Sequence, residues 1–383
     1  MYLRTLEEGI ALSPIKEMEF RASRIPGVVS LAQGIPSMDT PDMIKRFVIE
    51  AITQSKVAKY SLSSGLPELR ETIERHLAQD NIYYDYTSEI IVTAGSIEAI
   101  TATLLTLLRP NDEVILFSPS YASYPQAVRV AHGVPVWVPL VEERGWALDI
   151  ESIRSTITPR TRAILLATPN NPTGTQFSPN ELRAMATLAK EHDLILIVDE
   201  VYKDIVFSND SVYSLAQERA FKSQVVMIYS FSKSYAMTGW RVAFLGTHQT
   251  LAQEILKVHD ALVTCAPVVS QYAAIAALEM GASVRAAVRT LYQERCNLIC
   301  GFLDTLKHIF SYQRPTSSYF VFPRVHNMSA SKQWAIDLLE QARVAVVPGV
   351  AFGPTGEGHV RMCFGRSEED IAEAFRRMSA YLH

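Results

Sequence analysis

The stretch that decides the fold is Val225-Val226-Met227-Ile228-Tyr229-Ser230-Phe231-Ser232-Lys233-Ser234-Tyr235-Ala236-Met237-Thr238-Gly239-Trp240-Arg241. Its first five residues are apolar and rich in β-branched side chains, which is typical of a strand buried on both faces of a parallel sheet. A serine-rich turn then places Lys233 at the carboxyl end of that strand, where open α/β sheets bind ligands and where a lysine can form a Schiff base. Ser230, Ser232 and Arg241 suit an anion such as phosphate. The competing interpretation is a solvated loop lysine beside incidental serines.

Working outward, the length and charge of the chain bound its class. With 383 residues it is long enough for two domains. The net charge of −4 offers no basic surface for nucleic acid or for acidic membranes, so we expect neither partner. Residues 261–278 carry no charge, but their proline, polar residues and alanines favour a buried helix over a membrane span. The first eight residues contain acids where a signal peptide needs an apolar segment, so no export signal is expected.

Cysteine usage points to a reducing compartment. The four cysteines show no zinc-like CxxC pair, and we expect no metal site. Cys296 and Cys300 lie four residues apart in an expected helix, which favours buried small side chains over a disulfide. A cytoplasmic location fits best.

From about residue 89 the chain alternates between strand and helix patterns, which predicts a parallel sheet. Polar or aromatic residues follow four of these expected strands: Gly95 and Ser96 after 90–93, Tyr121 after 114–117, Asn171 after 162–167, and Asp199 after 194–198. A glycine-serine turn that opens a helix is a ready phosphate site, although many such turns bind nothing. Tyr121 would stack on a flat ligand or pack on its neighbours. Asp199 would need a cation if it is buried, and exposure at the strand end is the alternative.

The remainder of the chain has a different pattern. Gly34 lies beside Ile35 and Pro36, which suggests close backbone approach, and Tyr60 begins a loop that is either a hydroxyl-bearing site loop or a plain connector. Beyond about residue 265 long helices and short strands dominate. We therefore expect a large domain over residues 45–265 and a smaller α+β domain formed by residues 1–44 together with residues 266–383.

Taken together, these segments resemble the class I aminotransferases, pyridoxal 5′-phosphate (PLP) enzymes of the aspartate aminotransferase fold family, fold type I. The resemblance covers nearly the whole chain, with markers in order from Gly34 to Arg361. Its signatures are Asn171-Pro172-Thr173-Gly174, Asp199-Glu200-Val201-Tyr202, Ser230-Phe231-Ser232-Lys233 and Gly239-Trp240-Arg241. Each motif is modest alone, but their shared order and spacing is specific.

The resemblance implies a role for each matching residue. Lys233 would hold PLP as a Schiff base and carry the proton, while Asp199 would pair with the pyridine nitrogen. Tyr202 and Asn171 would bind the phenolic oxygen, and Tyr121 would stack on the ring. The phosphate would be bound by Gly95, Ser96, Ile97, Ser230, Ser232, Arg241 and, from the neighbouring subunit of a homodimer, Tyr60. Arg361 would take the substrate carboxylate, helped by Asn171 and the Gly34 backbone.

The implied function is a ping-pong aminotransferase that moves the amino group of an amino acid to a 2-oxo acid. A carbon–sulfur β-lyase on the same fold is the alternative enzyme. A ligand-sensing module of a transcription regulator is the non-enzyme alternative, and only about thirty residues precede Gly34, too few for a DNA-binding domain. Departures from the usual family wording at residues 34–39, at Ile97 and at residues 315–320 leave the side-chain pocket unassigned, with a lean away from dicarboxylates.

Overall fold

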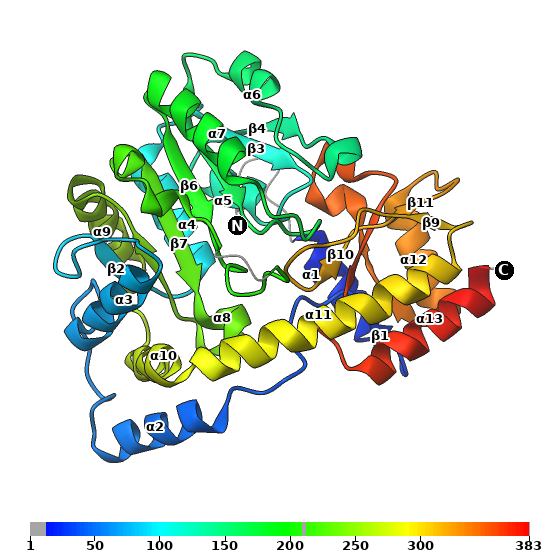
Figure 1. The fold of residues 1–383 in the computed structure, drawn as a ribbon, viewed down its shortest axis with the longest axis horizontal. Coiled ribbons are helices and arrows are strands. Elements are labelled where there is room, and N and C mark those ends of the chain that lie inside the picture. Colours follow the sequence, from blue (N-terminus) through cyan, green and yellow to red (C-terminus); the bar gives the residue numbers. More distant parts are fainter. Residues whose placement is uncertain (1–12, 209–211, 383) are drawn as a thin grey trace, which may run out of the picture.

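The computed structural model describes residues 13–208 and 212–382, and its centre is a seven-stranded sheet (Figure 1). The strand order is β2-β8-β7-β6-β5-β3-β4. Strand β8 runs antiparallel to both of its neighbours, and the other pairs are parallel. The strands are β2 (Ile90–Thr93), β3 (Glu113–Ser118), β4 (Val134–Pro139), β5 (Thr161–Ala167), β6 (Ile195–Asp199), β7 (Val225–Ser230) and β8 (Ala243–Gly246). The α/β class with a mostly parallel sheet is thereby confirmed.

Helices cover both faces of this sheet because its strands are apolar on both faces. In β3, Ile115 and Phe117 belong to one core cluster, whereas Val114 and Leu116 belong to another on the opposite face. This alternation is the two-residue period of a strand. The first cluster includes side chains of α7 (Pro179–Glu191), and the second includes those of α4 (Ser96–Leu107), α5 (Tyr124–Val130) and α9 (Gln249–Val263). The sheet is therefore the middle layer between two layers of helices, and only the ends of its strands are left uncovered by them.

The carboxyl third lies beside the large sheet, and α11 (Ala282–Thr305) runs between the two regions (Figure 1). Strand β1 (Val29–Ser30) pairs in parallel with β12 (Val344–Ala345), which joins the amino-terminal lead-in to this region. Around them lie α1 (Pro14–Ala22), β10 (Phe320–Val321), β13 (Val347–Pro348), β14 (Val360–Cys363), α12 (Ser331–Ala342) and α13 (Glu368–Leu382). Where the boundary between two domains falls stays a prediction.

Most expected elements are present, and the differences are local. The serine-rich stretch is a one-turn helix, α8 (Phe231–Ser234), rather than a turn, because the Ser230 hydroxyl caps its first turn by accepting from the Ser232 N–H. The uncharged stretch around residue 270 contributes to α10 (Val268–Met280), which packs on α2 (Asp42–Thr53) and α3 (Pro67–Gln79). Within the described residues, no helix has the length and hydropathy needed to cross a membrane. The first twelve residues of the lead-in lie outside the described part.

The cysteines follow the expectation from spacing. Cys296 and Cys300 are buried on α11 with their Sγ atoms 4.0 Å apart, and neither forms a disulfide.

Candidate active site

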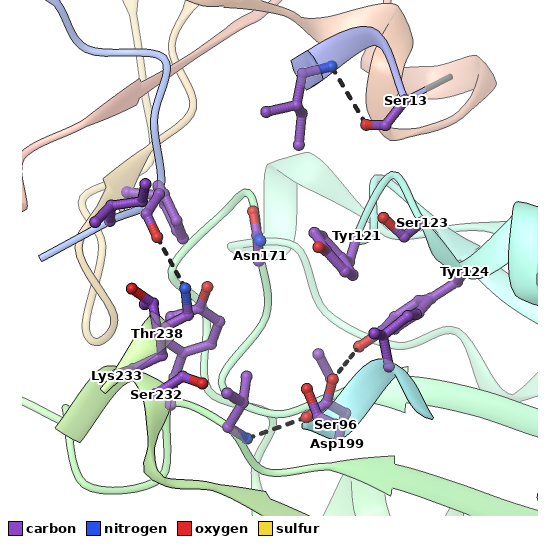
Figure 2. Close-up of a pocket in the computed structure, with 18 of the residues that line it drawn as sticks. Ser13, Ser96, Tyr121, Ser123, Tyr124, Asn171, Asp199, Ser232, Lys233 and Thr238 are labelled. Carbon is purple, nitrogen blue, oxygen red and sulfur yellow. Dashed lines mark hydrogen bonds between the residues drawn. The ribbon is translucent and has the colours of Figure 1, made fainter. Parts of the chain in front are cut away.

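A cavity of about 390 Å³ lies at the carboxyl ends of the parallel strands, between the large sheet and the carboxyl third (Figure 2). Its wall includes predicted site residues from both regions: Gly34, Ser96, Ile97, Tyr121, Asn171, Asp199, Tyr202, Ser232, Lys233, Arg241 and Arg361. Because β3, β5, β6 and β7 are parallel neighbours, the residues that follow them in the chain meet at one edge. The fold thus gathers residues that are more than three hundred positions apart in sequence.

Lys233 projects into the cavity from α8, directly after β7 (Figure 2). Its Nζ donates to the Gly34 carbonyl oxygen at 2.8 Å, and the Tyr319 hydroxyl donates to the same oxygen at 3.0 Å. Burial lowers the pKa of Lys233 to about 8, helped by the positive charges of Arg361 and Arg241. A larger fraction of this amine is therefore neutral near pH 7 than for an ordinary lysine, as a nucleophile or a proton acceptor requires.

Asp199 is the last residue of β6, and its side chain is buried. The Tyr124 hydroxyl donates to Asp199 Oδ2 at 2.8 Å, and the Val201 N–H donates to Oδ1 at 3.2 Å (Figure 2). Burial nevertheless raises the pKa of Asp199 to about 6. Of the two alternatives that the sequence left open for this carboxylate, the structure shows the buried one. Among the described residues, no cation is bonded directly to it.

Sequence reasoning missed Tyr124, the hydroxyl that holds Asp199. The residue stands at the start of α5 and is buried, with its ring edge-on to Tyr121 at 5.4 Å between centroids. A second tyrosine three residues after Tyr121 was the available signal, since both lie beyond the end of β3. Only the packing of β3 beside β5 and β6 shows that it reaches Asp199.

The expected phosphate site is the amino-terminal end of α4. Gly95 has a φ of 94°, and a Cβ there would lie 2.3 Å from Arg241 Nη2, so only glycine lets the guanidinium cover this backbone. Ser96 and Ile97 form the first turn, whose N–H groups lack helical partners. The Ser230 and Ser232 hydroxyls lie 3.0 Å apart at the neighbouring strand end. Backbone N–H groups, hydroxyls and one guanidinium thus converge, which is the donor set for a phosphate.

Arg361 is buried at the other side of the cavity, on β14 with 1% exposure. Its guanidinium donates to Asn171 Oδ1 at 3.1 Å and to the Ala32 carbonyl oxygen at 2.6 Å, and its carbon centre lies 4.3 Å from the Phe320 ring centroid. Among the described residues, its hydrogen-bond partners are this amide oxygen and this carbonyl oxygen and include no carboxylate, and its buried Nε has no partner. A buried cation without a counter-anion, facing a cavity, is built to receive one.

Of the remaining predicted residues, three line the cavity and one does not. Tyr121 and Tyr202 line the cavity, and Tyr202 packs edge-on against Tyr319 and Phe320. The Gly34 backbone also lines it, but its carbonyl accepts from Lys233 rather than facing open space. Tyr60 lies apart from the cavity of its own chain and is 84% exposed.

The residues present fit PLP. Burial has raised the pKa of Asp199, and a protonated ring nitrogen is the cation that would favour its ionised form. Lys233 offers an amine with a lowered pKa for a covalent link to an aldehyde. Gly95 and Arg241 provide a cradle that any side chain at position 95 would fill.

Comparisons with known proteins agree with this geometry. The model of the family "Aminotransferase class I and II" matches residues 26–378. An aromatic-amino-acid aminotransferase 2 of Thermococcus litoralis is 35% identical over 98% of this chain and 97% of its own length. An aspartate aminotransferase of Pyrococcus abyssi is 35% identical over 97% of this chain and 95% of its own length. The solved structure of an aspartate aminotransferase from Thermus thermophilus with maleate has a TM-score of 0.92 and 32% identity, covering 99% of each chain.

The chain therefore belongs to the class I and II aminotransferase family. It is a PLP-dependent aminotransferase that transfers the amino group of an amino acid to a 2-oxo acid. The relatives support this reaction and not the carbon–sulfur lyase that was the alternative from sequence.

Proposed function

We propose that Lys233 and Asp199 carry the chemistry of the amino-group transfer. When bound, PLP supplies an aldehyde that bonds to amines and a ring that accepts the electron pair of the broken Cα–H bond. Lys233 Nζ would bond to that aldehyde, give way to the substrate amine and then carry the proton removed from Cα. Asp199 would hold the ring nitrogen protonated, with Tyr124 orienting its carboxylate through the 2.8 Å hydrogen bond.

Other residues would bind and orient the cofactor. Tyr202 and Asn171 would donate to the phenolic oxygen, and Tyr121 would lie against the ring face. Both tyrosines line the same cavity as Lys233, which supports these positions. The phosphate would be held by Gly95, Ser96, Ile97, Ser230, Ser232 and Arg241. Since these groups come from two strand ends and one helix, the phosphate would fix the cofactor relative to the large sheet.

The single observation that carries this proposal is that one cavity contains two buried charges of opposite sign, Arg361 and Asp199, and that neither is paired with a counter-ion among the described residues. Arg361 is a buried guanidinium that lacks an anion, and Asp199 is a buried carboxylate that lacks a cation in direct contact. An amino-acid carboxylate would satisfy the first, and a protonated ring nitrogen the second. Lys233 lines the cavity with them. Arg361 would therefore fix the substrate carboxylate, with Asn171 holding the guanidinium in place.

The assembly we propose is a homodimer in which Tyr60 reaches the neighbouring site. Tyr60 is almost fully exposed on a loop that is nevertheless anchored, because Gln271 Nε2 donates to Ser61 Oγ at 3.0 Å. On α2, Ile49 and Ile52 are 61% and 50% exposed, which suits a covered face. We further propose the domain division at residues 45 and 265, and a cytoplasmic location.

The first experiment is an absorbance spectrum of the purified protein followed by single amino acids without any oxo acid. A visible cofactor band that is lost while one 2-oxo acid appears per site is expected, because ping-pong transfer completes its first half alone. A band that persists while pyruvate and thiol accumulate from cysteine would contradict the transfer reaction.

Two variants test the residue roles. Lys233→Ala should fold, lose the covalent link seen by mass spectrometry after borohydride reduction, and lose more than about 10⁴-fold in turnover. Asp199→Ala should keep the covalent link and lose proton abstraction from Cα, measured as exchange of the Cα deuterium. Normal turnover by Lys233→Ala would refute its assignment.

A further inference from the structure

Two ionisable side chains lie beside the expected phosphate site and have no part in the proposed mechanism. Glu98 is in the first turn of α4, and His259 is on α9. His259 Nδ1 lies 3.0 Å from Glu98 Oε1, and the two side chains are 0% and 11% exposed, respectively. Burying such a pair costs desolvation that apolar side chains of the same size would not. The segments that the pair joins therefore decide what it does.

Glu98 fixes the backbone of the phosphate cradle in its own chain. Its Oε2 accepts from the Ala94 N–H at 3.0 Å, and the Ala94 carbonyl oxygen accepts from Arg241 Nη2 at 3.5 Å. Both bonds involve the residue before Gly95, whose backbone lies under the Arg241 guanidinium. Because the first turn of α4 has N–H groups without helical partners, the position of this turn sets where a phosphate would bind. Glu98 therefore acts on the cradle through the Ala94 backbone.

His259 also contacts a second segment, the loop of residues 60–65. Its Nε2 lies 3.0 Å from the Ser63 carbonyl oxygen. A carbonyl oxygen only accepts hydrogen bonds, and so does the ionised Glu98 carboxylate, so a ring with hydrogen on both nitrogens satisfies both neighbours. The two side chains thus form a buried bridge, the Glu98–His259 bridge, between the start of α4 and this loop.

The loop of residues 60–65 is held firmly to its own chain. The Val92 N–H donates to the Ser64 carbonyl oxygen at 3.0 Å. Gly65 has a φ of 105°, and a Cβ there would lie 2.5 Å from Val92 Cγ2, so the loop lies directly on β2. Tyr60 at the start of the loop is nevertheless 84% exposed. A fixed loop with an exposed tyrosine suits contact with another chain, since tyrosine offers a large ring and a polar hydroxyl.

We infer that Glu98 and His259 are positioning residues for two cofactor sites, that of their own chain through the α4 turn and that of the partner through the loop that presents Tyr60. This inference rests on the proposed homodimer, in which Tyr60 reaches the neighbouring phosphate. Neither residue of the bridge touches the cofactor or the reacting atoms. Damage to the bridge in one chain should therefore weaken cofactor binding in both chains of a dimer, whereas damage to one cradle should weaken one site only.

The test uses mixed dimers of one wild-type and one variant chain, isolated with two affinity tags and stripped of cofactor. PLP is added at increasing concentration, the covalent link is reduced with borohydride, and mass spectrometry measures the labelled fraction of each chain separately. His259→Phe keeps a ring at this position and removes both N–H groups. Half-maximal labelling should move to about tenfold higher PLP concentration in the variant chain and in its wild-type partner alike. A shift in the variant chain alone, or in neither chain, would overturn the inference.

Two control variants should affect one site each. Arg241→Gln should shift labelling by about tenfold only in the chain that carries it, because Arg241 lies over Gly95 of its own cradle. Asp260→Ala should shift labelling only in the wild-type partner. Its Oδ1 accepts from the Ser63 hydroxyl at 2.6 Å, and among the described residues no hydrogen bond joins its side chain to α4. A shift in both chains with either control would overturn the particular role of the bridge.

Variants of Glu98 keep the inference testable if His259→Phe does not fold. In Glu98→Gln the new amide can accept from the Ala94 N–H and donate to a neutral His259 ring, so both chains should label as in the wild type. Glu98→Ala removes both contacts and should shift both chains by about tenfold. Equal behaviour of these two variants would overturn the role assigned to the hydrogen bonds.

Failure of the proposed function would look different from failure of this inference. Absence of labelling in the wild-type dimer would refute the proposed role of Lys233, and sedimentation of the wild type as a monomer would refute the proposed homodimer. Either result would overturn this inference as well. A wild type that dimerises and labels normally, combined with a His259→Phe defect confined to its own chain, would overturn the inference alone.

Discussion

Arg241 and Arg361 both face the cavity, yet their surroundings differ. Arg241 is exposed and lies over the backbone of Gly95, at the proposed phosphate site. Arg361 is 1% exposed, lies between the Phe320 and Phe352 rings, and donates to Asn171. An exposed arginine shares its ligand with hydroxyls, N–H groups and water, whereas a buried one has lost its water and depends on few partners. The difference teaches that substrate recognition should depend on Arg361 far more than cofactor binding depends on Arg241.

The largest expected effect is at Arg361. Arg361→Met removes the guanidinium from a site where water cannot replace it, so kcat/KM for any amino donor should fall about 10³-fold. Arg361→Lys keeps the charge but loses the planar fork and should recover only part of this loss. Both variants should retain the cofactor band, because Arg361 lies away from the phosphate cradle. A loss smaller than about tenfold would show that another group holds the carboxylate.

A smaller effect is expected at Arg241. Arg241→Gln should weaken cofactor binding about tenfold, measured by equilibrium dialysis, because the α4 amino terminus and the Ser230 and Ser232 hydroxyls remain. Turnover at saturating cofactor should stay close to that of the wild type. Cofactor affinity should also depend less on salt in the variant, since an exposed charge is screened. A thousandfold loss of affinity would contradict the contrast between the two arginines.

The smallest effect is a shift in pH dependence at Asp199. Its pKa is already raised to about 6 by burial, while the Tyr124 hydroxyl favours its charged form. Tyr124→Phe removes that donor, so the pKa should rise further and the acid limb of the kcat/KM profile should move up by about one unit. Tyr84→Phe is the control, because the buried Tyr84 hydroxyl has no hydrogen-bond partner among the described residues. If the acid limb is unchanged in Tyr124→Phe, the Tyr124 hydroxyl does not stabilise the ionised form of Asp199.

The same raised pKa affects the stability of the cofactor-free protein. Asp199 is protonated in the folded state at pH values where the unfolded chain has already lost the proton. The folded state then binds more protons, so the contribution of Asp199 to the free energy of unfolding falls as pH rises from about 4 to about 6. Tyr124→Phe should extend this fall to higher pH, which thermal unfolding across that range would detect.

That Asp199, Lys233 and the Gly95–Ser96 turn meet at one edge of the sheet could be predicted from sequence, because these residues follow strands of recognisable pattern. The apolar runs before Asp199 and Lys233 become β6 and β7, and the turn at Gly95 and Ser96 opens α4. Parallel neighbours must present their carboxyl ends together, so a pattern along the chain is enough to bring these residues to one edge. Helix starts depend on equally local signals: the capping box of Ser178 and Glu181 opens α7 with two hydrogen bonds between residues three positions apart.

What the sequence alone determined about this protein is the class of fold and the family, because these depend on local patterns and short motifs. The residues that it assigns to the cofactor stay a prediction. The tertiary structure decided what depends on contacts between distant segments. Among these are the Tyr124 bond to Asp199, the Gly34 carbonyl that holds Lys233, and the burial of Arg361 beside Ala32, which lies 329 residues away. It also decided that Ile15, Lys16 and Glu19 of α1 line the cavity. No local pattern encodes such contacts, because they arise only when separately folded segments pack against one another.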